Sequence, residues 1–203
     1  MDRFLPRFQY PYALNPDRPM THGALGPPDI YSEAKLAQEV ALRESMSVIL
    51  RTWDEFANIF DRKYRPVEEY RTEGAETLLL TMGSYTETAK MVIDERRDKG
   101  EAVGLISVRL WRPFPFEELR RAVQDARLLI VFDRCISFGM WRPVFSEARS
   151  ALYDQDRRPK VVGFIGGLGG RDVPEREFGY LIDRGRAVAA KGSDKMIETV
   201  GIR

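Results

Sequence analysis

From Thr77 onward, short apolar runs alternate with amphipathic stretches, and this alternation restricts the fold more than any other feature of the sequence. Four runs are typical of strands, and a stretch with helical spacing follows each of them. Because parallel strands need crossover connections of this length, the pattern predicts an α/β fold, a mostly parallel sheet with helices on both faces. The predicted strands and helices, in pairs, are 77–82 with 84–100, 103–110 with 115–126, 128–132 with 141–153, and 161–165 with 175–189.

The first 28 residues are predicted to form an extended arm. Half of the 12 prolines lie before Tyr31, and each fixes its own φ and steers the preceding residue away from helix. The arm also carries more apolar side chains than a solvated tail needs, among them Phe8, Tyr10 and Leu14. We expect it to lie across its own domain or a partner, and an ordinary extended wrap over the same core is equally open.

A long helix is predicted over the segment 29–65, with Asp29 as its N-cap and its end near Pro66. Apolar residues recur there in alternating steps of four and three, which places them on one face. Packing on the chain's own domain is favoured over a coiled-coil partner, because the pattern covers only about three heptads. The predicted domain then spans 66–190, with a tail at 191–203. The face comprises Leu42, Met46, Ile49, Trp53, Phe56 and Phe60.

Two glycine-containing loops after predicted strands are weak candidates for an anion site. Ligands gather beyond the carboxyl ends of such strands. Gly83 and Ser84 begin a helix, where backbone N–H groups suit a phosphate, but a capping box of Ser84 with Glu87 explains the same residues. Gly169, Gly170 and Arg171 follow the last strand and could cradle an anion, yet a tight turn that braces an interface is favoured.

Other residues at the strand ends are predicted to serve structure or interfaces. Arg112 and Phe114 lie in an R-P-F-P sequence whose prolines stiffen the loop, a combination suited to docking. Asp133 and Arg134 end a strand and are predicted to form an internal ion pair or half of a subunit contact. Asp172 follows the glycine-rich loop and is assigned to the same structural group.

The residues show no constellation that would run a reaction unaided. The only histidine, His22, and the only cysteine, Cys135, have no nucleophile, base or metal-ligand cluster near them in the sequence. The formal net charge of +1 favours neither nucleic acid nor an anionic membrane, and no apolar run approaches a membrane span. The N-terminal sequence lacks a secretory signal, so we expect a cytoplasmic protein.

Six segments together resemble the C-terminal, transketolase-like part of the α subunit of pyruvate:ferredoxin oxidoreductase. This enzyme, also called pyruvate synthase, is one of the thiamine-diphosphate-dependent 2-oxoacid:ferredoxin oxidoreductases. The resemblance runs in order from about Asp2 to about Asp183. The segments are GALGPPDIY (23–31), EEYRTEGAE (68–76), GSYTETAK (83–90), VGLISVRLWRPFPFEELRRA (103–122), DRCISFG (133–139) and GFIGGLGGRDVP (163–174).

The resemblance implies a complex that cleaves a 2-oxoacid, most simply pyruvate, and transfers the acyl group to coenzyme A while reducing ferredoxin. Thiamine diphosphate, Mg²⁺, iron-sulfur clusters and coenzyme A are expected in the complex, with none bound by this chain alone. The implied partners are pyrimidine-binding, diphosphate-binding and cluster-bearing chains, with ferredoxin reached through the complex. The chain corresponds to the support domain only, as a naturally split subunit or a fragment.

One departure from the family pattern leaves the substrate open. Met140, Trp141 and Arg142 stand before Pro143, where the family has small residues. Another 2-oxoacid, such as an aryl glyoxylate or oxalate, is therefore an alternative. A freestanding module that binds coenzyme A or a nucleotide at 83–86 and 166–171 is a second hypothesis, and an independent enzyme is a weaker third.

Overall fold

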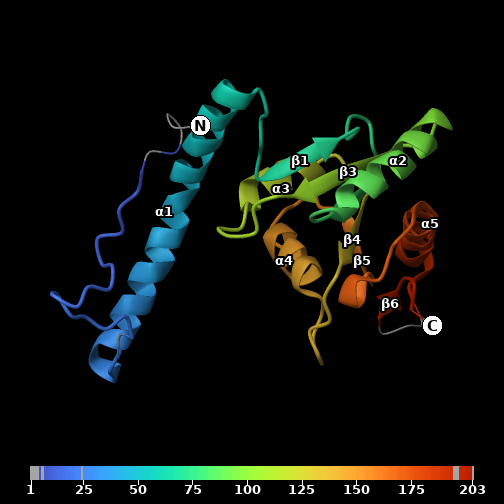
Figure 1. Cartoon of the computed structure of the whole chain (residues 1–203). Coiled ribbons are helices and arrows are strands. Elements are labelled where there is room, and N and C mark those ends of the chain that lie inside the picture. Colours follow the sequence, from blue (N-terminus) through green and yellow to red (C-terminus); the bar gives the residue numbers. More distant parts are fainter. Residues whose placement is uncertain (1–4, 6, 24, 194–196, 203) are drawn as a thin grey trace. The chain divides into compact units, whose positions relative to one another are not determined.

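The computed structural model describes residues 5, 7–23, 25–193 and 197–202. The chain divides into two units, Met1–Tyr64 and Arg65–Arg203, which are considered separately. Figure 1 shows the elements of both units along the chain. None of the described helices combines the length and the apolar character that crossing a membrane requires.

The second unit is built on a six-stranded sheet with the order β1-β3-β2-β4-β5-β6. All neighbouring pairs are parallel except β1 with β3, which is antiparallel. Strands β2 to β5 match the four predicted strands, and this confirms the prediction of a mostly parallel sheet. The strands are β1 (Val67–Tyr70), β2 (Thr77–Thr81), β3 (Val103–Val108), β4 (Leu128–Asp133), β5 (Lys160–Ile165) and β6 (Glu198–Thr199).

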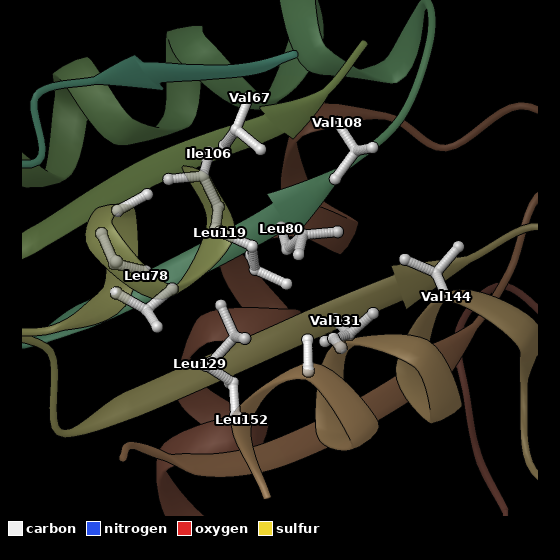
Figure 2. Close-up of a cluster of buried hydrophobic side chains, with 14 of the residues drawn as sticks. Val67, Leu78, Leu80, Ile106, Val108, Leu119, Leu129, Val131, Val144 and Leu152 are labelled. Atoms are coloured by element: carbon white, nitrogen blue, oxygen red, sulfur yellow. The ribbon is translucent and has the colours of Figure 1, made fainter. Parts of the chain in front are cut away.

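Helices cover both faces of the sheet, as predicted. On one face, α3 (Phe116–Val123) and α4 (Pro143–Leu152) pack on a buried cluster that includes Leu80 and Val131. Figure 2 shows this cluster between the strands and these helices. On the other face, α2 (Tyr85–Asp98) and α5 (Glu175–Lys191) enclose a second buried cluster. Successive β2 residues alternate between the two clusters because side chains of a strand alternate in direction.

The strands of the middle of the sheet are buried along their whole length. Every residue of β2, β3 and β4 is buried. This is the expected environment of parallel strands whose two faces are both covered, and it explains why they are near-continuous apolar runs in the sequence. The carboxyl ends of these strands are therefore held in fixed positions.

Some boundaries differ from the prediction for clear physical reasons. Helix α4 begins at Pro143 and not at Trp141, because proline suits the first turn and ψ of Arg142 is extended. The short strands β1 and β6 were not predicted. Strand β6 lies in the predicted tail, where Glu198 and Val200 are buried.

The first unit contains the predicted long helix, α1 (Pro28–Phe60). The prediction that Asp29 caps it is wrong, because the cap position is Pro27 and Asp29 lies in the first turn. The helix ends where Asp61 adopts the left-handed conformation with φ of 53°. In the preceding arm, the ring of His22 is bonded to the carbonyl oxygen of Tyr12 at 2.8 Å. None of the described residues of this unit is buried.

Candidate functional site

The strand order places a topological switch point between β2 and β4. From β2 the chain moves outward to β3 and then crosses back to β4 on the other side of β2. In sheets of this kind, ligands bind in the crevice beyond the carboxyl ends of the two central strands. The loops that leave β2, β4 and β5 at this edge therefore form the candidate site.

Tyr85 joins these three loops. Its hydroxyl donates a hydrogen bond to the carbonyl oxygen of Arg171 at 2.9 Å, which links the β2 loop to the β5 loop. The guanidinium of Arg134, from the β4 loop, lies over the Tyr85 ring at 4.4 Å. The inner edge of the ring packs against Phe132 and Phe178, with centroids at 5.6 and 6.3 Å. Tyr85 is thus the centre of the candidate site.

Gly167 is the residue of the β5 loop that makes room for Tyr85. Its φ is +65°, a conformation that favours glycine, and an added Cβ would lie 2.3 Å from the Tyr85 hydroxyl oxygen. Gly169 has a similar φ of +61°, but an added Cβ there would meet nothing within 4 Å. Position 167 therefore favours glycine both for its positive φ and for the space that Tyr85 occupies, whereas position 169 favours it for its positive φ alone.

The predicted capping box at the start of α2 is wrong. Ser84 occupies the cap position with helical φ and ψ, and its side chain makes no cap hydrogen bond. Glu87 instead pairs with Lys90 at 2.9 Å. The first turn is closed by backbone bonds, among them one from the N–H of Thr86 to the carbonyl oxygen of Gly83. Gly83, with φ of +67°, provides the turn.

The glycine-rich loop after β5 is tied to the C-terminal part of the chain. Gly169 and Gly170 lie in a short 3₁₀ turn, and both are exposed. The Arg171 guanidinium donates to the carbonyl oxygen of Gly201, so this side chain is engaged inside the chain. Asp172 is exposed beside it. These contacts show a turn held within the chain. Its predicted role in bracing an interface, and an anion site at Gly83, Ser84, Gly169, Gly170 and Arg171, stay predictions.

Asp133 does not pair with Arg134, which corrects one of the two predicted alternatives. The buried carboxylate accepts hydrogen bonds from the backbone N–H groups of Val144 and Phe145, at 2.9 and 3.1 Å. These donors belong to the N-terminus of α4, where a negative charge is favourable. Burial nevertheless raises the pKa of the Asp133 carboxyl above its ordinary value, while these two bonds and the charge of Arg142 act to lower that pKa.

Arg142 is the second buried ion at this end of α4. Only 4% of its surface is exposed, and it donates from Nη2 to the carbonyl oxygen of Gly163 at 2.7 Å. Its guanidinium lies 4.9 Å from the Phe145 ring centroid. Burial lowers the pKa of Arg142 below its ordinary value, although the negative charges of Asp133 and Glu198 act to raise that pKa. Asp133 and Arg142 thus hold the two ends of the intervening loop.

That loop exposes large apolar side chains although its ends are buried. Phe138 is 93% exposed, Met140 is 66% exposed, and Trp141 is 47% exposed. Met140 and Trp141 also line an open groove of about 380 Å³ along α4, together with Tyr153. Monomeric proteins seldom expose apolar groups so close together without an interaction that uses them.

Arg112 and Phe114 both make contacts within the unit, and their predicted role in docking stays a prediction. Arg112 forms a two-pronged ion pair with Glu147 of α4, with distances of 2.7 and 2.6 Å. Phe114 is partly buried against the core, 5.6 Å from the Trp111 ring and 5.0 Å from the Phe116 ring. They fix the β3 loop and have no described contact with Tyr85.

A separate cavity of about 320 Å³ lies at the ends of β2 and β3. Gly83, Thr86 and Ser107 contribute to its wall. The buried hydroxyl of Thr86 is bonded to those of Thr81 and Ser107, at 2.9 and 3.0 Å. The charged groups of the wall include Glu68 and Arg109, which pair with each other at 2.6 and 2.9 Å. The cavity is at the small end of the range for ligand pockets.

The described residues offer structural polar contacts more than reactive groups. No three His, Cys, Asp or Glu side chains among them gather closely enough to hold a metal ion. Cys135 is exposed beside Arg134, and its thiol contacts the carbonyl oxygen of Ile136 at 3.6 Å. His22 lies in the first unit, away in sequence from these loops.

Sequence reasoning identified the loops of this site but not their central residue. Tyr85 lies in the segment GSYTETAK, but the predicted anion site comprised its neighbours Gly83 and Ser84. An aromatic residue directly after a glycine turn at the end of a buried strand is the signal that could have revealed it. The sequence also showed that Arg142 departs from the family pattern, but it did not predict that the charge of Arg142 is buried.

Comparisons with known proteins agree with this architecture. Residues 75–178 match the model of the family described as pyruvate:ferredoxin oxidoreductase core domain II. In structure, the chain is similar to a split-gene transketolase solved as an inactive β4 tetramer. The TM-score is 0.50 at 14% identity, over 64% of this chain and 44% of that one. That likeness concerns the fold alone.

Curated relatives extend the similarity to the whole chain. Pyruvate synthase subunit PorA of Methanothermobacter thermautotrophicus is 44% identical over 184 residues, which cover 91% of this chain and 47% of the relative. PorA of Pyrococcus abyssi is 36% identical over all of this chain and 52% of its own length. Ketoisovalerate oxidoreductase subunit VorA of Pyrococcus horikoshii is 36% identical over 98% of this chain and 51% of the relative. The chain spans about half the length of these relatives, and it belongs to the pyruvate:ferredoxin oxidoreductase core domain II family.

Proposed function

We propose that this chain is the scaffold part of a 2-oxoacid:ferredoxin oxidoreductase that uses pyruvate. The observation that carries the proposal is the 44% identity to a pyruvate synthase subunit over 91% of the chain. The complete enzyme would convert pyruvate and coenzyme A to acetyl-coenzyme A and CO₂, with the two electrons passing to ferredoxin, or would run the reverse reaction.

Thiamine diphosphate with its Mg²⁺, the iron-sulfur clusters and coenzyme A are assigned to the partner chains, as the family resemblance implies. When bound there, thiamine diphosphate supplies the carbanion chemistry of the cleavage. We assign no catalytic step to the residues of this chain. Its own contribution is to hold rigid loops at the carboxyl edge of the sheet against the chains that carry the cofactors.

The contacts at this edge support a scaffold role. Tyr85, Asp133, Arg142 and Arg171 all direct their polar atoms to backbone groups of the same chain. Such bonds fix loop positions and leave few polar groups to orient a substrate. The exposed side chains of the loop after β4, Phe138 above all, suit contact with another protein.

Purification from the native cell tests the proposal. The chain, tagged in its own gene, should co-purify with subunits that give pyruvate- and coenzyme A-dependent reduction of a viologen dye. The purified chain alone should give none, which serves as the control. A tagged chain that comes out with no oxoacid-dependent activity, under anaerobic handling that preserves the clusters, would remove the proposal.

The same preparation distinguishes the substrate. The relatives include a subunit named for ketoisovalerate at 36% identity, close to the 39% of the pyruvate synthase subunit from the same organism. Pyruvate, 2-oxoisovalerate, phenylglyoxylate and oxalate should therefore be compared as kcat/KM. We expect the highest value for pyruvate, and a higher value for another oxoacid would correct the substrate but not the enzyme class.

A further inference from the structure

Helix α1 is a long amphipathic helix without a core of its own. Its 33 residues extend over about 50 Å at 1.5 Å per residue. None of its residues is buried, and the same holds for the described residues of the arm before it. Because most helices of proteins gain their stability from packing an amphipathic face, a helix in this condition needs a surface to cover it.

The side to be covered is the predicted one, which we call the α1 apolar face. At 100° per residue its six members fall within a stripe of about 80°. Leu42 is 39% exposed there, and Met46 and Ile49 are half-buried. Near the end of the helix the rings of Phe56 and Phe60 lie 4.4 Å apart. The face comprises Leu42, Met46, Ile49, Trp53, Phe56 and Phe60.

The surface of α1 outside this face provides the contrast. Glu39 and Arg43, about 60° and 100° from the centre of the face, form an ion pair at 2.6 Å, one helical turn apart and largely exposed. Leu36 and Val40 lie among these polar residues, and both are exposed. By the helical period they point about 120° and 160° away from the centre of the α1 apolar face.

We infer that the α1 apolar face docks on the half of the pyruvate synthase subunit that this chain does not span. This inference rests on the proposed function. The family model covers only residues 75–178, whereas the Pyrococcus abyssi relative matches the entire chain. The relatives therefore share the arm and α1, and about half of their length has no counterpart here. Each of these relatives therefore contains α1 together with a half that could supply the surface for it.

A second copy of this chain fits the face less well. Three of the six residues, Trp53, Phe56 and Phe60, are aromatic. Two-stranded coiled coils favour aliphatic side chains at their core positions, and large rings would oppose each other in a parallel pair. A broad apolar surface of a folded domain accommodates such rings better.

Co-expression tests the inference with paired variants. The full chain, tagged, is co-expressed with the unmatched half of the Methanothermobacter thermautotrophicus subunit, and the amount of that half retained is measured. The variant Leu42→Glu/Ile49→Glu should reduce retention at least about tenfold. The matched control Leu36→Glu/Val40→Glu introduces the same charges on the other side of the helix and should retain the half as the unmodified chain does.

Hydrogen exchange provides a measurement that does not depend on the variants folding. Amides of residues 42–60 should exchange at least about tenfold more slowly in the co-expressed complex than in the chain alone. Unchanged exchange overturns the inference. So does equal retention by the two variants, and so does an α1-dependent dimer of the chain alone.

Failure of this inference is distinguishable from failure of the proposed function. If the unmodified chain does not retain the expressed half, the docking inference is overturned. The native preparation described above then decides separately whether the chain belongs to an active oxoacid oxidoreductase. An active native complex with unprotected α1 would leave the proposed function standing.

Discussion

Substituting Gly167 by alanine should destabilise the second unit through two separable effects. The first is backbone strain, because alanine at a φ of +65° costs about 1–2 kcal/mol. The second is a collision, because the new Cβ would lie 2.3 Å from the hydroxyl oxygen of Tyr85 and 2.8 Å from two ring carbons. The ring cannot simply turn away, since it packs against Phe132 and Phe178.

The two effects together give the expected magnitude. Overpacking of an ordered ring costs about 1–3 kcal/mol, so the sum is about 2–5 kcal/mol. For a domain of this size the melting temperature falls about 3–4 °C per kcal/mol, which predicts a drop of about 6–20 °C. Gly169→Ala is the matched control, because it carries the same strain at φ of +61° and meets no neighbour. It should cost only about 1–2 kcal/mol.

Urea unfolding and thermal melts followed by circular dichroism measure these differences in the full chain. A double-mutant cycle with Tyr85→Ala isolates the collision. In that background Gly167→Ala should cost only the strain, so the coupling energy between the two sites should be about 1–3 kcal/mol. The reasoning is refuted if Gly167→Ala and Gly169→Ala cost the same, or if the two changes at 167 and 85 are additive.

Three further changes test other parts of the structure. Asp133→Asn removes a carboxyl whose pKa in the folded chain is raised above 3.8. The natural chain should therefore lose stability relative to this variant as the pH rises from below 3.8 through the folded pKa. Urea titrations between about pH 3 and 7 check this, and a constant difference contradicts it. Glu147→Gln breaks the ion pair between Glu147 and Arg112, whose side chains are 31% and 46% exposed, respectively. Because both groups are partly solvated, the change should lower the free energy of unfolding in urea by less than about 1 kcal/mol. Leu80→Ala removes a fully buried side chain and should cost about 2–5 kcal/mol by the same method, so a smaller loss would mean that the core of Figure 2 is loosely packed.

The elements in which apolar residues recur in a regular pattern along the sequence were predictable. The four central strands are apolar runs because both of their faces are covered, and the helices show the 3.6-residue spacing of one buried side. Strand β1 was not predictable in this way, because its four residues, VEEY, contain two glutamates and lie at the edge of the sheet. Strand β6 has only two residues and is defined by pairing with β5, which no local pattern records.

The candidate site was predictable as a set of loops but not as a set of contacts. Parallel topology places the ends of β2, β4 and β5 at one edge, so sequence reasoning could name the segments. The partners depend on long-range geometry. An ion pair with the neighbouring Arg134 was one of the two alternatives predicted for Asp133, but Asp133 bonds to the start of α4, and Arg134 lies over Tyr85, which is far from it in sequence. Adjacency in sequence was therefore a poor guide to the partners of these two charges, and a subunit contact stays a prediction.

The distribution of polar and apolar groups at the carboxyl edge favours a protein partner over a small molecule. A site for a small ligand needs convergent polar groups that are not already engaged. Here Tyr85 and Arg171 are bonded to backbone oxygens, and Asp133 accepts from two amides. The bonds of Asp133, and that of Arg142 to the carbonyl oxygen of Gly163, hold the two ends of the loop that carries Phe138 into solvent at 93% exposure. Since a fixed loop loses little conformational entropy on binding, the polar contacts at its base would strengthen association at its apolar tip.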